Sequence, residues 1–265
     1  MNTYAYLWTK DQAGKGSCEG STCVQLFLRE KRKEGAKRVN LISDRCPGQN
    51  QNRMFLIMLS DMLNELEFDM IELTYLVPGH SQNENDTAHS VIEKHTRDMT
   101  IYTPAQWEST IPQAFKTNKC VMTVLTFTDV IDYKNPEFFP LYRQVLNDKV
   151  FPINEDKKCK KVMWASIVQL MFSSHDKNKI FYKYDYTEEY RECVFREEPK
   201  MTRKKKSSGT IVKQRYLEPR DISALKKKYI LKLVDKAFIK AQHRGYFESL
   251  IVTKDKRGED NVVEV

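Results

Sequence analysis

One carboxylate, Asp44, stands where an apolar segment gives way to a tight turn. The apolar segment is Val39–Ile42, and Pro47-Gly48 marks the turn. We expect the segment to be a buried strand that delivers Asp44 at its carboxyl end. A carboxylate in that position suits a divalent cation and nucleotide chemistry, because Mg²⁺ binds carboxylate and phosphate oxygens. The simpler alternative is an Asp that only hydrogen-bonds the backbone of its own turn.

Three amide side chains, Gln49, Asn50 and Asn52, follow this carboxylate. Their side chains could bind phosphate or bases, orient Asp44, or cap the next helix. Capping by Asn50 is the simplest of these roles, and it predicts a helix over 51–66. That helix is apolar on every side, which indicates burial.

A second group of polar residues follows the next predicted strand, 70–77. The strand leads to His80, and a helix over about 85–98 then carries Asp86, His89 and Glu93. Spacings of three, four and seven residues place these three on one helix face, where they could ligate a metal. Ile92 beside Glu93 predicts a partly buried carboxylate. The alternatives are an Asp near the helix dipole and a His–Glu pair on a solvated face. For His80 three roles stay open: a metal ligand, a general base, or a residue that hydrogen-bonds the turn.

The order of elements predicts an α/β fold. Strands and helices alternate from residue 3 to residue 98, which favours parallel strands joined by helices, with sites at the carboxyl ends of strands. We expect a partial core over 1–135, a small β-rich extension over 136–198, a basic linker over 199–216, and a helical tail over 217–265, helical from Asp221 to Leu250 with a disordered end.

Positive charge is concentrated late in the chain. The net charge is +8, but residues 200–244 hold fifteen Lys and Arg against three Asp and Glu, which gives +12 and leaves −4 elsewhere. Within this segment, Arg203, Lys204, Lys205 and Lys206 predict DNA contact or a nuclear address. The alternative is a solvated linker.

Bulk properties exclude other classes. No apolar run reaches about eighteen residues, so we expect no membrane span, and the N-terminus lacks the features of a signal peptide. The six cysteines form no C-x-x-C pair, which argues against a structural zinc site and favours reduced thiols.

Two motifs resemble those of a known family. Ser43–Arg53 is similar to a pattern Ser-Asp-x-Cys-x-Gly-Gln-Asn-x-Asn, and Leu76–Lys94 to its companion, Gly-His-(Thr/Ser) followed by Asp-x-x-His-x-x-Ile-Glu. Tyr6-Leu7-Trp8 and Gly16–Cys23 are similar to upstream elements of the same family. The family is an uncharacterised transposon-derived domain with a ribonuclease-H-like, DDE-transposase core, and the similarity covers roughly residues 4–190.

The resemblance implies a fold and a set of roles. The fold would be a ribonuclease-H-like layered sheet with flanking helices. Three carboxylates would bind Mg²⁺ (or Mn²⁺) for DNA cleavage or strand transfer, with Asp44 as the second and Glu93 as the third. Asp86 and His89 would be auxiliary ligands or would orient other ligands. DNA is then the expected partner, in the nucleus, and homo-oligomerisation is left open.

This chain departs from the family pattern at three places. The first carboxylate belongs on a first core strand, and we expect the chain to begin after that strand. Lys10 stands where an acidic residue is common, and Gly20 where an apolar one is usual. We therefore expect the ancestral activity to be incomplete or lost. Two other hypotheses compete with it: a domesticated nucleic-acid or protein interaction module, and a metal-dependent hydrolase of small phosphate esters.

Overall fold

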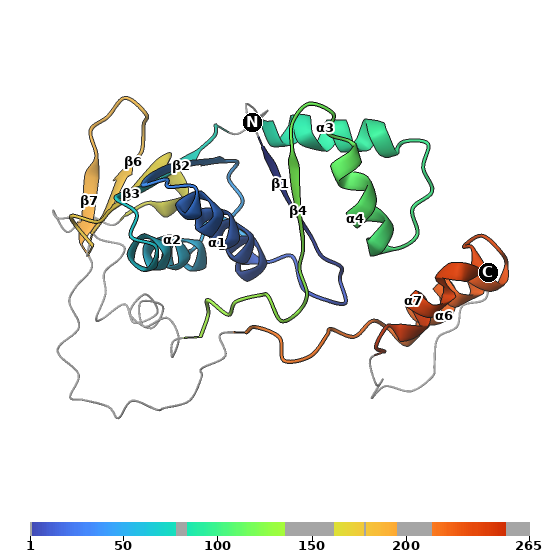
Figure 1. The fold of residues 1–265 in the computed structure, drawn as a ribbon. Coiled ribbons are helices and arrows are strands. Elements are labelled where there is room, and N and C mark those ends of the chain that lie inside the picture. Colours follow the sequence, from blue (N-terminus) through green and yellow to red (C-terminus); the bar gives the residue numbers. More distant parts are fainter. Residues whose placement is uncertain (1, 78–83, 136–161, 178, 195–213, 253–265) are drawn as a thin grey trace. The chain divides into compact units, whose positions relative to one another are not determined.

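The computed structural model describes residues 2–77, 84–135, 162–177, 179–194 and 214–252 (Figure 1). It is an α/β protein with a two-stranded and a five-stranded sheet. The chain divides into two compact units. Unit 1 comprises Met1–Gly14, Glu84–Thr128 and Tyr216–Val265, and unit 2 comprises Lys15–Asn83 and Asp129–Arg215.

Unit 2 contains the five-stranded sheet, in the order β2-β3-β5-β6-β7. Its strands are β2 (Arg38–Ser43), β3 (Met70–Tyr75), β5 (Gln169–Ser173), β6 (Lys179–Lys183) and β7 (Arg191–Val194). The β2–β3 pair is parallel, with Asn40 opposite Glu72, and the remaining pairs are antiparallel. The sheet is therefore mixed, whereas the sequence predicted parallel strands.

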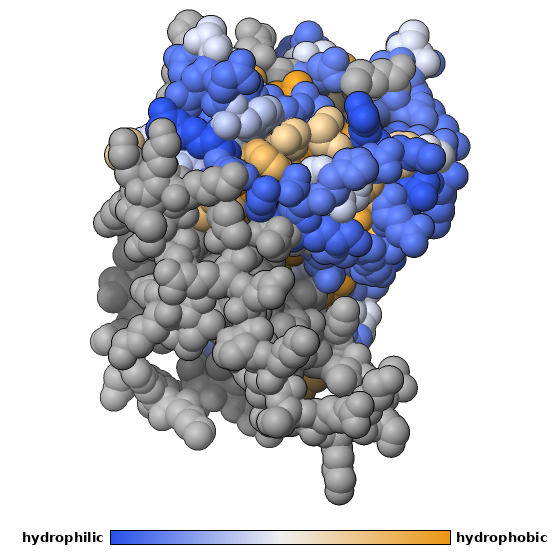
Figure 2. All heavy atoms as spheres, turned by 90° about the vertical axis from the view of Figure 1, so that its left-hand side faces the viewer, coloured by the Kyte–Doolittle hydropathy of each residue, from blue (hydrophilic) through white to orange (hydrophobic). Residues whose placement is uncertain are grey.

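Two helices, α1 (Ser17–Lys33) and α2 (Arg53–Glu65), pack against each other, and α2 contacts β3 and β5 (Figure 1). The core beneath them comes from alternate strand positions, because successive side chains of a strand point to opposite faces. Leu73, Leu170 and Ile180 are buried here, while their neighbours Glu72 and Phe181 are only partly buried. Figure 2 views the side on which β7 lies in Figure 1 and shows a hydrophobic area bordered by hydrophilic residues.

Helix α2 is buried as predicted, since every residue from Phe55 to Ser60 is buried. The predicted cap was wrong. Asn52, not Asn50, is the N-cap, and its side chain accepts the N–H of Phe55 at 3.2 Å. The carbonyl of Cys46 takes the N–H groups of residues 49, 50 and 51, so these residues form a turn and the helix begins later.

Strand β2 is not the buried strand that the sequence predicted. None of its residues is buried, and the side chain of Ile42 is 56% exposed. The reason is its position: within the described part of the chain, β2 pairs only with β3 and forms an edge of the sheet.

Unit 1 contains β1 (Thr3–Leu7) paired in parallel with β4 (Cys120–Val124). Its helices are α3 (Glu84–Thr96), α4 (Pro104–Gln113), α6 (Ala224–Asp235) and α7 (Arg244–Ser249). The single helix predicted over 221–250 is thus two helices. Ala237, with φ +60°, lies just beyond α6, and a left-handed residue cannot continue a helix.

Short 3₁₀ turns complete the described elements. One is η1 (Trp164–Ser166) in unit 2 and the other is η2 (Ala241–His243) in unit 1. No described helix is long and apolar enough to cross a membrane. The cysteines within the described ranges are free thiols.

Candidate functional site

Asp44 is exposed and directly follows β2, at the carboxyl end of the parallel pair β2–β3. Its carboxylate accepts one long hydrogen bond, 3.4 Å from the Nδ2 of Asn50 to its Oδ1. The same Nδ2 donates to the hydroxyl of Ser43 at 3.0 Å, and that hydroxyl donates to the carbonyl of Asp44 at 2.8 Å. Asn50 therefore orients the carboxylate, which is one of the roles the sequence left open.

The turn that carries Asn50 is fixed from both sides. The Oδ1 of Asn50 accepts the N–H of Cys46 at 3.0 Å, and its carbonyl accepts the hydroxyl of Tyr75 at 2.9 Å. Burial raises the pKa of the Tyr75 hydroxyl, so the phenol stays neutral and keeps its proton to donate. The carbonyl of Tyr75 in turn accepts the hydroxyl of Tyr186. A buried side chain of β3 thus holds the Asp44 turn in place.

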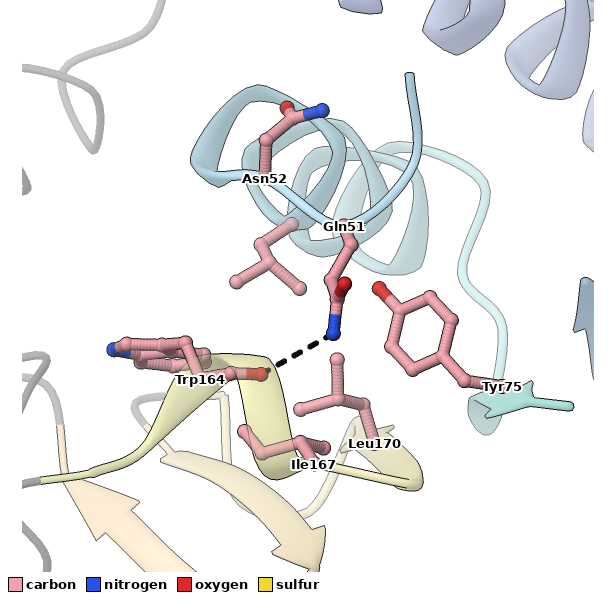
Figure 3. Close-up of a pocket in the computed structure, with 7 residues that line it drawn as sticks. Gln51, Asn52, Tyr75, Trp164, Ile167 and Leu170 are labelled. Carbon is pink, nitrogen blue, oxygen red and sulfur yellow. Dashed lines mark hydrogen bonds between the residues drawn. The ribbon is translucent and has the colours of Figure 1, made fainter. Parts of the chain in front are cut away.

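A cavity of about 220 Å³ adjoins this turn (Figure 3). Its lining comes from the turn before α2, from α2, from β3 and from the segment 164–170. The lining residues are Gln51, Asn52, Leu56, Tyr75, Trp164, Ile167 and Leu170.

The polar side chains of the cavity differ in how they are held. Gln51 extends between Trp164 and Tyr75, and its Nε2 donates to the carbonyl of Trp164 at 3.4 Å (Figure 3). Asn52 points the other way, because its amide caps α2 and donates to the carbonyl of Pro47 at 3.0 Å. Gln51 is therefore the amide that the cavity presents to a ligand.

Arg45 brings a positive charge to the same region. Its Nη1 donates to the carbonyl of Ala165 at 3.3 Å, and the Nε2 of Gln51 reaches that carbonyl at 3.5 Å. The Nε of Arg45 is buried and has no hydrogen-bond partner among the described residues. A buried N–H without a partner is costly, and a guanidinium forms its strongest hydrogen bonds with anions, so an anionic ligand beside the Arg45 guanidinium would be favourable.

The second predicted group lies on α3 in unit 1. Asp86, His89 and Glu93 are all exposed, and α3 has no buried residue, so the expected burial of Glu93 was wrong. The spacing does place the three on one helix face. Asp44 belongs to unit 2, so neither unit by itself contains both Asp44 and Glu93.

Several predicted residues yield no site in the structure. Gln49 is exposed, with no hydrogen bond from its side chain among the described residues. His80 and the basic residues Arg203, Lys204, Lys205 and Lys206 lie outside the described ranges. In the described part of the chain, no three His, Cys, Asp or Glu side chains lie close enough to hold a metal ion.

Comparison of the sequence with known families shows which family the chain belongs to. A family model described as "Domain of unknown function (DUF7869)" matches residues 2–168, more than half of the chain. The chain belongs to the DUF7869 family. No curated protein and no solved structure matches the chain significantly.

The DUF7869 match contains most of the candidate site. It includes the Asp44 turn, the α3 face and the cavity wall as far as Ile167, and it ends before β5. Sequence reasoning missed the cavity because its walls come from segments about ninety residues apart. Gln51 was one more amide in a polar run, and Trp164 was one more apolar residue in the predicted β-rich extension.

Proposed function

We propose that this DUF7869 domain acts on phosphodiester bonds of nucleic acid, with Asp44 as a catalytic carboxylate of a ribonuclease-H-like core. The observation that supports the proposal is how Asp44 is presented. It is exposed at the carboxyl end of a parallel strand pair, where α/β sheets form their sites, and Asn50 orients it. If Asp44 only hydrogen-bonded the backbone of its own turn, the hydrogen bond from the buried Tyr75 to Asn50 would not be needed to hold it.

The carboxylate of Asp44 fits the role of one metal ligand. Only its Oδ1 has a hydrogen bond among the described residues, so the other oxygen is open to a cation. Mg²⁺ is usually bound by one or two carboxylates together with substrate phosphates and water. Such a cation would polarise the phosphate and activate water. Asn50 would hold Asp44 in place, and Arg45 would attract the phosphate.

A cleavage assay tests this function. A labelled DNA duplex and a single strand would be incubated with the full chain in Mg²⁺, in Mn²⁺ and in EDTA. Because the chain departs from the family pattern, we expect weak metal-dependent cleavage, which Asp44→Asn lowers about 100-fold or more. Glu93→Gln tests separately the role that the family resemblance gives to the α3 carboxylate.

The matched control is Asp69→Asn. Asp69 is also exposed and next to a strand of the same sheet, but it precedes β3 and therefore lies at the amino end. Asp69→Asn should cleave like the unmodified chain. If Asp44→Asn also cleaves like the unmodified chain, Asp44 is not catalytic.

A second function, nucleic-acid binding without cleavage, is favoured by two observations. The described residues contain no cluster of three metal-ligating side chains, while residues 200–244 carry a net charge of +12. A protein that only binds nucleic acid needs positive charge, but it needs no cluster of metal-ligating side chains. DNA binding that persists without any metal-dependent cleavage would select this function over the first.

A further inference from the structure

We propose that the cavity between Trp164, Tyr75 and Gln51 binds a single nucleobase, and that Arg45 binds the phosphate of the same nucleotide. The assignment rests on the proposed function in taking nucleic acid as the ligand, and adds where one nucleotide is held. The cavity volume, about 220 Å³, lies below the roughly 300–1,000 Å³ of pockets for drug-sized ligands, which suits one small ring system.

The walls of the cavity suit a flat aromatic ring. Two side chains of the lining, Trp164 and Tyr75, are aromatic, and Leu56, Ile167 and Leu170 are buried aliphatic residues. Bases that leave a stack are commonly held between aromatic and apolar side chains, because every base has a π-face. The side chain of Trp164 is only partly buried, so its indole is accessible from solvent.

Gln51 gives the cavity a group that can recognise a base edge. The contacts of its Nε2, at 3.4 and 3.5 Å, are long for hydrogen bonds, and its Oε1 accepts none from the described residues. A glutamine amide can donate and accept at once, which matches the paired donor and acceptor on the edge of a base. A bound base would replace the two long contacts of Gln51 with two well-formed hydrogen bonds, which favours binding.

Charge around the cavity selects a nucleotide over a neutral ring. No carboxylate is among the lining residues, and the guanidinium of Arg45 lies at the Ala165 carbonyl that Gln51 also reaches. The buried Nε of Arg45 has no partner in the described part of the chain. The amino end of α2 also borders the cavity, since Asn52 and Leu56 are among the lining residues. Helix amino ends attract phosphate.

The cavity is also connected to the proposed catalytic carboxylate. Tyr75 lines the cavity and donates to the carbonyl of Asn50, and the amide of Asn50 holds Asp44. A base in the cavity would thus bring its sugar and phosphate to the turn that carries Asp44. The cavity would fix one nucleotide of the strand relative to that carboxylate.

Binding of a short labelled oligonucleotide, measured by fluorescence anisotropy in EDTA, tests the assignment without any cleavage. An otherwise identical oligonucleotide with abasic positions keeps the phosphates and lacks the bases. We expect the abasic strand to bind the full chain roughly tenfold more weakly, the size expected for losing one stacked base. Equal binding of the two strands would overturn the proposal.

Three variants locate the effect in the cavity. Trp164→Ala and Gln51→Ala should each reduce the preference for the intact strand over the abasic one, and Arg45→Gln should weaken binding to both strands. The control is Trp107→Ala, which removes an indole from α4 in unit 1 and should leave the preference unchanged. Gln51→Ala removes no core side chain, so it keeps the test valid if Trp164→Ala fails to fold. A preference that survives in Gln51→Ala and in every folded Trp164 variant would place the base elsewhere.

Competition distinguishes the source of the nucleotide. If a mononucleotide displaces the labelled strand, and Trp164→Ala abolishes this displacement, the cavity is a site for free nucleotides. If only oligonucleotides displace the labelled strand, the cavity binds a base within a strand. If neither competes in a Trp164-dependent way, the cavity does not bind bases. Base-dependent binding without metal-dependent cleavage would uphold the cavity and reject the catalytic proposal, so the two can fail separately.

Discussion

At the scale of single residues, the site depends on one buried group, the Tyr75 hydroxyl, that must remain uncharged. Tyr75 can hold the Asp44 turn only while it keeps its proton, and burial raises its pKa. Burial likewise raises the pKa of Tyr133, and that of the Cys23 thiol to about 12. These groups ionise more readily in the unfolded chain, where Cys and Tyr have pKa values of about 8.5 and 10.

The free energy of unfolding should therefore fall at alkaline pH. Below about pH 8 the groups are neutral in both states and the stability is fully present. As the pH rises, the unfolded chain loses protons first, so stability decreases progressively. Urea unfolding at pH 7.5, 9 and 10 measures this. Tyr75→Phe should cost about 1 kcal/mol at pH 7.5 and show a smaller alkaline loss. A stability that is unchanged up to pH 10 would contradict the role of burial.

At the scale of elements, the amino end of α2 determines where the site residues lie. Sequence reasoning found α2 and its burial, because an all-apolar helix has few alternatives. It misplaced the cap by two residues, since any of several amides in the run 49–52 could serve. The carbonyl of Cys46 decides between them by collecting three N–H groups into a turn.

The choice of cap can be tested by stability. Asn52→Ala should lower the free energy of unfolding by about 1 kcal/mol, the usual size for a lost N-cap. Gln49→Ala should change it by less than about 0.5 kcal/mol, because Gln49 is exposed in the same turn. Chemical denaturation of both variants measures the difference. Equal effects would show that Asn52 is not the cap.

A second element, β2, shows a different limit of sequence reasoning. The apolar run Val39–Ile42 correctly predicted a strand, but hydrophobic composition does not reveal whether a strand has one neighbour or two. Ile42 is 56% exposed at the sheet edge, whereas Leu73 on β3 is fully buried. The second partner of β3, beside β2, comes from residues 169–173, and no local pattern indicates that pairing.

At the scale of the whole molecule, chemistry and charge occupy different parts of the chain. Asp44 and its supporting residues belong to unit 2, the α3 carboxylates to unit 1, and the positive excess lies in residues 200–244. Composition alone revealed the charge segregation. The cavity could not be predicted, because its position depends on Trp164 approaching a turn formed by residues 46–51.

The basic segment should control the salt dependence of DNA binding. The slope of log affinity against log salt concentration is negative for DNA binding, by about 0.9 per phosphate contact. Changing Lys204, Lys205 and Lys206 to Gln should therefore reduce the magnitude of this slope by up to about 2.7 for duplex DNA. A control with the same charge change, Lys37, Lys116 and Lys177 to Gln, alters exposed lysines elsewhere and should affect the slope less. Equal slopes for the two variants would remove the special role of residues 204–206.

The most direct measurement for the central claim is a metal-switch experiment at Asp44. A thiolate prefers softer metals than Mg²⁺, so Asp44→Cys should lose DNA cleavage in Mg²⁺ and regain part of it in Mn²⁺. Asp44→Asn should regain none, and Asp69→Cys should behave as the unmodified chain in both metals. The account predicts this pattern in single-turnover cleavage. Full Mg²⁺-dependent cleavage by Asp44→Cys, or no metal-dependent cleavage by the unmodified chain, would contradict it.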